Sequence, residues 1–113
     1  MAADRLQVAR ASYDAYASGD RGAIEEILAD DDFTFYSPDD VGIDRATYFE
    51  HCWPNSDWIA GFEFKRLVEN GDEMIVTYEG ERTDGGRFRN TEVLTFDGDE
   101  IRKVEVYYGW NLE

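Results

Sequence analysis

One carboxyl group lies in an alternating pattern that would place it inside the protein. Glu92 alternates with Leu94 and Phe96, so the three side chains share one face of a predicted strand. Burial disfavours the charged carboxylate and raises its pKa, and such a group can both donate and accept a proton. Two interpretations are open. Glu92 is either an acid/base group in a pocket, with Asn90 beside it as a ligand contact, or a cross-strand ion-pair partner for an arginine such as Arg82 or Arg66.

Tyrosines supply further polar groups in this small chain. Six of them recur along its length: Tyr13, Tyr16, Tyr36, Tyr78, Tyr107 and Tyr108. A buried phenol needs a hydrogen-bond partner, and several phenols around one cavity suit a flat, oxygenated, partly aromatic ligand. We assign a catalytic role to Tyr13 and ligand contacts to Tyr16, Tyr36 and Tyr108. The alternative for each tyrosine is an ordinary place in an aromatic core.

His51 is the only histidine, and its unperturbed pKa lies near neutrality. It adjoins Cys52 on a predicted helix, where neighbouring side chains point about 100° apart, so a Cys–His nucleophilic pair is disfavoured. His51 is therefore either a second acid/base group at the pocket mouth, partnering Glu92, or a partly exposed helix residue. Cys52 is expected to be a small buried hydrophobe.

Tryptophans are expected at the rim of the pocket. Trp53 and Trp58 flank a short polar segment, where they would form a lid or a platform for a ligand. Their alternative is packing against a sheet edge or a second subunit. Trp110 alternates with Tyr108 and should close one end of the pocket. We assign Trp53 and Trp110 to ligand contacts.

Neither a metal nor a cofactor is implied by the sequence. The acidic segments 30–32 and 97–99 lack the ligand spacing of an EF-hand. One histidine and one cysteine are too few for a tetrahedral zinc site. The glycine pair at 85–86 belongs to a hairpin turn, and no phosphate-binding or dinucleotide motif is present.

The order of predicted elements indicates an α+β domain spanning residues 1–113. Helical periodicity and caps predict helices over 3–18, 20–29 and 45–53, the last ended by Pro54. Alternation and turn residues predict strands over 33–37, 59–68, 74–83, 88–96 and 101–110. The last four strands follow one another through short turns, so they form an antiparallel meander with the helices against one face.

Composition excludes several classes of function. The chain has 113 residues, with 26 Asp or Glu and 11 Lys or Arg, which gives a net charge of −15. This excess repels phosphate backbones and anionic lipids, so we expect no nucleic-acid partner and no membrane partner. No apolar run approaches the roughly 20 residues of a membrane span. Since no signal peptide is evident and there is a single cysteine, we expect a cytoplasmic protein.

Several short segments together resemble the nuclear transport factor 2-like superfamily, specifically its SnoaL-like and ketosteroid-isomerase-like members. The resemblance covers nearly the whole chain and rests on the helix end Tyr13–Asp20, the acidic turn before Phe33, a strand ending at Pro38, the capped helix at Asp44-Arg45 and the hairpin Phe96–Ile101. It implies helices packed into a strongly curved, mainly antiparallel sheet that forms a cone with a pocket. It also implies a homodimer that pairs through the outer sheet faces.

Carried over residue by residue, the resemblance argues against steroid isomerisation. In ketosteroid isomerases the general base is an Asp directly before a Pro, and here Ser37 precedes Pro38. The tyrosine that stabilises the oxyanion falls near Ser12 or Tyr13, and the second oxyanion donor falls at Glu92.

These observations lead to two hypotheses about function. The first is a protein that binds a small apolar or aromatic oxygenated molecule and acts as a cofactor-free isomerase, cyclase or dehydratase-type enzyme. The second is a non-catalytic ligand-binding or protein-interaction module with the same fold.

Overall fold

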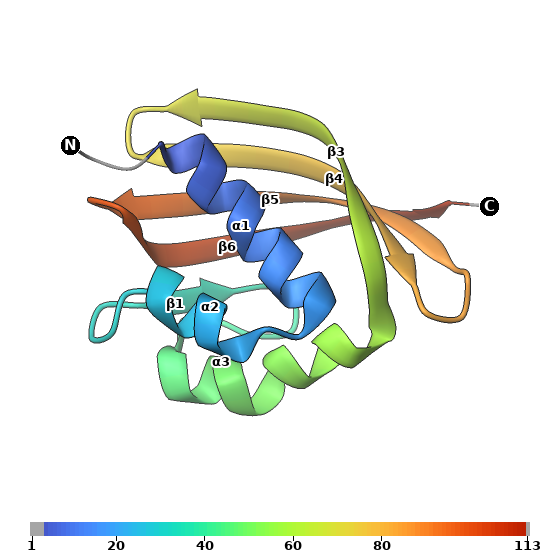
Figure 1. Ribbon diagram of the computed structural model, residues 1–113, viewed down its shortest axis with the longest axis horizontal. Helices are drawn as coiled ribbons and strands as arrows, with labels where there is room; N and C mark the ends of the chain where they lie inside the picture. Colours follow the sequence, from blue (N-terminus) through green and yellow to red (C-terminus); the bar gives the residue numbers. More distant parts are fainter. Residues whose placement is uncertain (1–3, 113) are drawn as a thin grey trace.

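The computed structural model describes residues 4–112 of the chain as three α-helices, a 3₁₀ helix and six strands (Figure 1). In chain order the elements are α1 (Arg5–Ser18), α2 (Arg21–Ile27), β1 (Thr34–Tyr36), β2 (Ile43–Asp44), α3 (Arg45–His51), the 3₁₀ helix η1 (Trp53–Trp58), β3 (Ile59–Asn70), β4 (Glu73–Arg82), β5 (Arg87–Asp97) and β6 (Glu100–Leu112). Within residues 4–112, no helix is long and apolar enough to cross a membrane.

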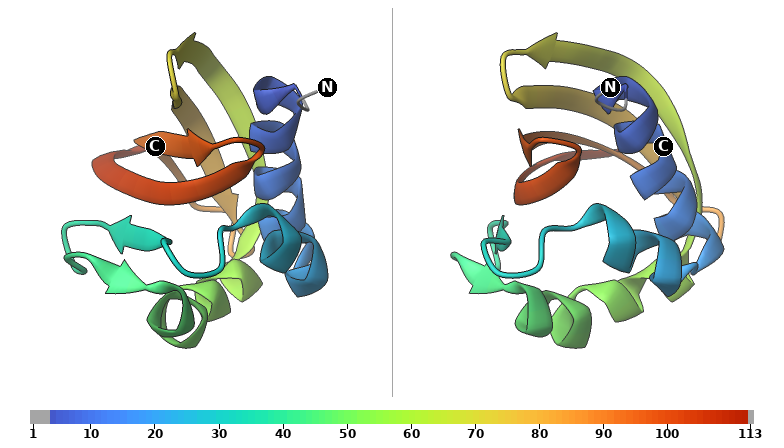
Figure 2. Two further views of the ribbon diagram at one scale, coloured as in Figure 1. Left: turned by 90° about the vertical axis from the view of Figure 1, so that its left-hand side faces the viewer. Right: turned by 60° about the vertical axis from the view of Figure 1, so that its left-hand side comes forward.

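All six strands belong to one sheet with the order β2-β1-β6-β5-β4-β3. Strands β3 to β6 form the expected antiparallel meander, and β1 adds to β6 in parallel. The sheet curls around α1, while α2, α3 and β1 close the other side (Figure 1, Figure 2). The α+β class and the cone of helices and curved sheet are therefore confirmed.

Helix ends follow the local signals in the sequence. The carboxylates of Asp20 and Asp44 accept hydrogen bonds from the backbone at the starts of α2 and α3. Gly19 ends α1 in the left-handed conformation at φ 72°. The expected helix start at residue 3 lies outside the described residues, and within them α1 begins at Arg5, capped by Asp4.

Two expectations about the segment 38–58 are wrong. The third helix ends at His51 rather than at residue 53, and Pro54 does not stop it but lies in the first turn of η1. Proline is tolerated there because an N–H in the first turn needs no helical partner. Between the predicted strand at 33–37 and the predicted helix at 45–53, where the sequence predicts no further strand, the protein forms β2, which pairs Ile43 with Phe35 of β1.

A β-bulge in β6 changes which residues face the inside of the cone. Tyr108 pairs with Asn90, but the next pair joins Trp110 to Arg89, so Gly109 is an extra residue between them. Trp110 consequently lies on the same face of the sheet as Arg89, whose guanidinium is 5.5 Å from the centre of the Trp110 ring. The Trp110 residue is 61% exposed. The prediction that Trp110 follows Tyr108 on one face is wrong because the bulge interrupts the alternation.

The hydrophobic core lies between the helices and the concave face of the sheet. Its most deeply buried large side chains are Phe33, Met74, Val76, Phe96 and Ile101. They come from the loop before β1 and from β4, β5 and β6, so the core links the distant parts of the meander to one another.

The bulge gives a test of the fold. A Cβ atom added at Gly109 would lie 2.1 Å from the Arg89 carbonyl oxygen, so we expect Gly109→Ala to lower the free energy of unfolding by about 1–3 kcal/mol in urea denaturation. Gly61→Ala is the matched control in a strand, because an added Cβ there meets nothing within 4 Å. Equal effects of the two substitutions would contradict this account.

Candidate active site

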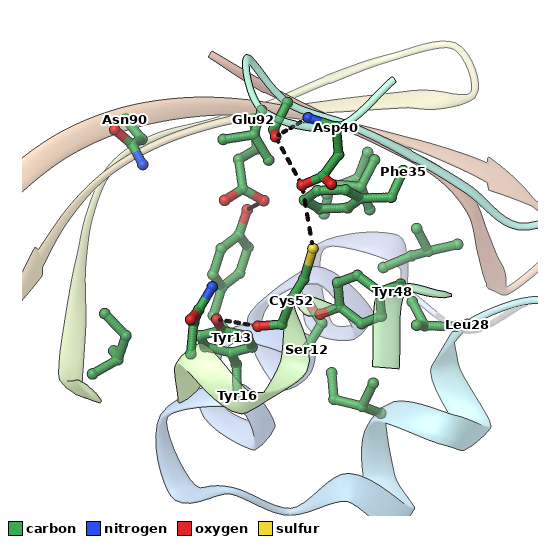
Figure 3. Close-up of a pocket in the computed structure, with 18 of the residues that line it drawn as sticks. Ser12, Tyr13, Tyr16, Leu28, Phe35, Asp40, Tyr48, Cys52, Asn90 and Glu92 are labelled. Carbon is green, nitrogen blue, oxygen red and sulfur yellow. Dashed lines mark hydrogen bonds between the residues drawn. The ribbon is translucent and has the colours of Figure 1, made fainter. Parts of the chain in front are cut away.

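A cavity of about 420 Å³ opens inside the cone between α1, the β1–β2 region, α3 and the concave face of the sheet (Figure 3). Its wall is largely aromatic and aliphatic, and six of its rings belong to Tyr13, Tyr16, Phe35, Tyr48, Phe62 and Tyr78. A concave, mostly apolar cavity with few polar groups is the usual form of a small-molecule site.

Glu92 is directed into this cavity from β5, as the alternation predicts (Figure 3). Tyr13 of α1 donates a hydrogen bond to one carboxylate oxygen at 3.0 Å, and Tyr78 of β4 donates to the other at 2.6 Å. The ion pair with Arg82 is not formed, because that guanidinium lies over Phe88 and donates to Asn111 outside the cavity. Glu92 is held by two neutral donors.

Asn90 connects this group to the bulge in β6. Its side-chain amide donates to the Tyr78 hydroxyl at 3.3 Å, and its side-chain oxygen accepts from the Gly109 backbone N–H at 3.2 Å. The bulge thus supplies the N–H that orients Asn90, which in turn contacts the phenol bound to Glu92.

Burial sets the protonation of all three side chains in this cluster. Removal from water raises the pKa of Glu92, although the hydrogen bonds from Tyr78 and Tyr13 oppose the rise. Burial, reinforced by the nearby Glu92 charge, also raises the pKa of both tyrosines well above 10. The phenols therefore remain neutral donors at physiological pH, and the Glu92 carboxyl holds its proton more tightly than an exposed glutamate does.

A second carboxyl group, which we did not predict from the sequence, enters the cavity from the loop after β1. Ser37 accepts hydrogen bonds from the N–H groups of Asp39 and Asp40, each at 3.1 Å, and this turn directs the Asp40 carboxylate into the cavity (Figure 3). The Ser-Pro-Asp-Asp order is a turn signal that could have indicated it. Cys52 lies 3.6 Å from this carboxylate, and burial together with Asp40 raises the thiol pKa to about 12.

Three more predicted residues line the cavity. Tyr16 donates to the Cys52 carbonyl at 3.4 Å, and Tyr108 lies at the mouth, where it donates to Asp39 at 3.1 Å. His51 also borders the cavity, but its side chain is 58% exposed and its ion-pair contact is with Glu50 at 3.9 Å, not with Glu92.

Three residues assigned to ligand contacts do not line this cavity. Tyr36 points to the outside of β1 and packs over Gly42. Trp53 packs against Tyr16 and Phe49, because the polypeptide continues as η1 instead of leaving α3 as a rim loop. Trp110 is turned away by the bulge.

The opposite face of the same strands carries a glutamate in a very different environment. Glu79 of β4 is buried on the outer face, where it is bound by Arg89 and, at 2.5 Å, by Arg87, with Lys65 at 4.0 Å. The hydrogen bond from Arg89 and the neighbouring cations lower the pKa of Glu79. The pKa values of Glu92 and Glu79 are therefore shifted in opposite directions.

In the described part of the chain, no three His, Cys, Asp or Glu side chains are placed to hold a metal ion.

Comparisons with known proteins bear on the fold and the family. The sequence model of the SnoaL-like domain matches residues 9–104, whereas no curated protein gives a significant match. An NTF2-like protein of unknown function from Cytophaga hutchinsonii has a TM-score of 0.76 at 14% identity, over 96% of this chain and 93% of its own. A LEH-like epoxide hydrolase from M. tuberculosis has a TM-score of 0.74 at 16% identity, over 93% of this chain and 82% of its own.

A protein with a ketosteroid isomerase-like fold from Catenulispora acidiphila, solved in complex with trimethylamine, has a TM-score of 0.69 at 17% identity, over 90% of this chain and 85% of its own. At these identities, the structural likenesses show a shared NTF2-like fold.

The opposite pKa shifts of the two glutamates give opposite pH dependences of stability. Glu92 has a raised pKa, so the unfolded chain ionises first, and the protein should lose stability relative to Glu92→Gln as pH rises from about 4 through the folded pKa. Glu79 has a lowered pKa, so its contribution is present at neutral pH and is lost as pH falls through the folded pKa.

Urea unfolding of the wild type, Glu92→Gln and Glu79→Gln over a pH series measures both effects. For the buried Glu92, a tenfold difference in proton affinity between the folded and unfolded chains corresponds to about 1.4 kcal/mol of stability. A difference between wild type and Glu92→Gln that stays constant with pH would show that the pKa of Glu92 is the same in both states.

Proposed function

Because the chain belongs to the family of SnoaL-like domains, we propose that it binds a small, mostly apolar molecule and acts on it by cofactor-free acid/base chemistry. The observation that carries this proposal is the Glu92 carboxyl, held by the hydroxyls of Tyr13 and Tyr78 on the wall of a largely apolar cavity. The reaction type is an isomerisation, cyclisation or dehydration of a substrate with a few polar groups.

In this proposal Glu92 moves the proton. Burial raises the pKa of Glu92 above its ordinary value, which makes its carboxylate a stronger base, and the low-polarity surroundings strengthen hydrogen bonds to developing charge. The raised pKa of Tyr13 keeps its hydroxyl protonated, and when Glu92 has taken up a proton this hydroxyl turns from Glu92 to donate to a substrate oxygen that gains negative charge. Steroid isomerisation is not proposed, because Ser37 stands where that reaction uses an Asp.

The remaining roles are assigned by position. Tyr16, Asn90 and Tyr108 contact the ligand along the wall and at the mouth, and His51 assists proton exchange from the rim. We further propose that residues 1–113 act as one domain in the cytoplasm.

A second candidate function is a ligand-binding module without catalysis. It is favoured by the fact that both oxygens of Glu92 already accept a hydrogen bond from a tyrosine of the protein. A carboxylate satisfied in this way can act as a structural group that rigidifies the cavity.

Deuterium exchange of 2-tetralone distinguishes the two candidates. This flat aromatic ketone has acidic C–H bonds beside its carbonyl, and NMR in deuterium oxide follows their exchange with solvent. We expect the protein to accelerate the exchange and Glu92→Gln to reduce the acceleration by about 10²-fold or more, since glutamine cannot transfer a proton. Glu79→Gln is the matched control on the outer face and should retain the acceleration.

Binding of 2-tetralone is followed in parallel by chemical shifts of the methyl groups of Leu28, Ile101 and Val104, which line the cavity. Binding without accelerated exchange would decide for the non-catalytic module. Unchanged shifts and exchange would contradict binding of a neutral aromatic ketone by this cavity, and equal exchange by Glu92→Gln would remove Glu92 from the reaction.

We also propose that the protein forms a homodimer through the outer face of its sheet. Large apolar side chains remain exposed on the long strands there, with Val68, Tyr107 and Trp110 each 50% exposed or more. Such exposure is typical of an interaction surface.

Salt is expected to strengthen this dimer. Two chains of −15 carry −30 together, and dissolved ions screen their repulsion. Sedimentation equilibrium should therefore show tighter association at high ionic strength than at low ionic strength. A monomer at both salt concentrations would disprove the dimer, and a dimer without salt dependence would show that repulsion does not limit its association.

A further inference from the structure

The inside of the cone carries acidic side chains, whereas the arginines and lysines lie outside its cavity. The cavity wall carries three carboxyl groups, those of Asp39, Asp40 and Glu92. The chain's 11 arginines and lysines all lie within residues 4–112, and none of them lines this cavity. Among the side chains that the structure describes, the one basic group that borders the cavity is His51, which is largely exposed at the rim.

The outer face shows what the protein does when it neutralises a buried carboxylate. Glu79 is surrounded by Arg87, Arg89 and Lys65. Glu92 instead accepts hydrogen bonds from two phenolic hydroxyls. Asp40 accepts hydrogen bonds from the Cys52 thiol and, at 3.4 Å, from the Ser37 hydroxyl. These donors are neutral, so within residues 4–112 no cationic side chain contacts the carboxyl groups of Glu92 and Asp40.

Aromatic rings surround the same space. Tyr13, Tyr16 and Tyr78 lie 5.2 Å, 6.1 Å and 5.0 Å from Phe62, centre to centre, and Tyr48 completes the wall toward β1. The electron-rich faces of aromatic rings attract cations, and aromatic cages recognise quaternary ammonium groups. Among the described residues, the arginines that contact rings do so at Phe49, Phe64, Phe88, Phe96 and Trp110, so none of them lies over a ring of this cluster.

We infer that the ligand of this cavity is a cation: an amine or quaternary ammonium group on an apolar body, bound with its charge toward Asp40 and Glu92. This inference rests on the proposed ligand-binding function and names the chemical class of the ligand. The net charge of −15 acts in the same direction, because a negative protein raises the local concentration of cations at a cavity lined with acidic groups.

A pair of probes with nearly the same shape isolates the charge. Choline and 3,3-dimethyl-1-butanol differ in that a positively charged nitrogen replaces a neutral carbon. NMR titration of the Leu28, Ile101 and Val104 methyl groups at millimolar probe concentrations measures both affinities. We expect choline to bind at least about tenfold more tightly, which is the scale of a cation–π contact strengthened by loss of water.

Substitutions of single carboxyl groups show where the ammonium group of choline binds. Asp40→Asn and Glu92→Gln should each weaken choline binding about fivefold to tenfold while leaving 3,3-dimethyl-1-butanol unaffected, because each removes one negative charge with little change of shape. Asp31→Asn is the control, since this exposed acid lies outside the cavity. Equal weakening by all three variants would place choline on the acidic surface and overturn the inference.

Two results would overturn the inference in different ways. If the neutral alcohol binds as tightly as choline, the ligand class is wrong, but the cavity remains a ligand site. If choline and the alcohol both leave the cavity methyl groups unperturbed and 2-tetralone does so too, ligand binding itself is contradicted and the proposed function fails with it.

Discussion

The contact of one carboxyl group with two phenols determines how the helix and the sheet of this protein are joined. Glu92 is removed from water, which is costly for a carboxyl group unless its oxygens receive hydrogen bonds. Tyr13 brings one donor from α1, and Tyr78 brings the other from β4. Since neither phenol can move away without leaving a buried oxygen unsatisfied, the position of α1 over the sheet and the shape of the cavity are set together.

The two faces of the long strands each bury a glutamate, and they surround it with groups of different charge. On the outer face, Arg87 and Arg89 both bind Glu79, and these three charges form an ordinary ion-pair network. On the inner face, neutral groups bind Glu92, and its protonation remains adjustable. A sheet that placed an arginine beside Glu92 would hold it ionised, and it would lose the property on which acid/base chemistry depends.

Much of this arrangement can be predicted from the sequence, because it depends on contacts between residues that are close in the chain. Caps such as Asp20 and Asp44, and turn residues between the strands, fix the helices and the meander through contacts within a few residues. The inward direction of Glu92 follows from strict alternation with Leu94. What could not be foreseen depends on contacts between distant segments. The bond from Tyr78 to Glu92 on the next strand is one example. The turn at Asp40 is readable from the local sequence, but the contact of its carboxylate with Cys52 on the cavity wall is not.

The extra residue in β6 determines how wide the cavity stays. If Gly109 were drawn into regular pairing, every side chain beyond it would exchange faces, and the indole of Trp110 would turn inward beside Tyr108. The largest side chain of the strand would then occupy the entrance. The register shift at Gly109 therefore decides whether the entrance of the cavity is open. Two chains of equal composition that differ in this register would have an open cavity in one case and a cavity blocked by the indole in the other.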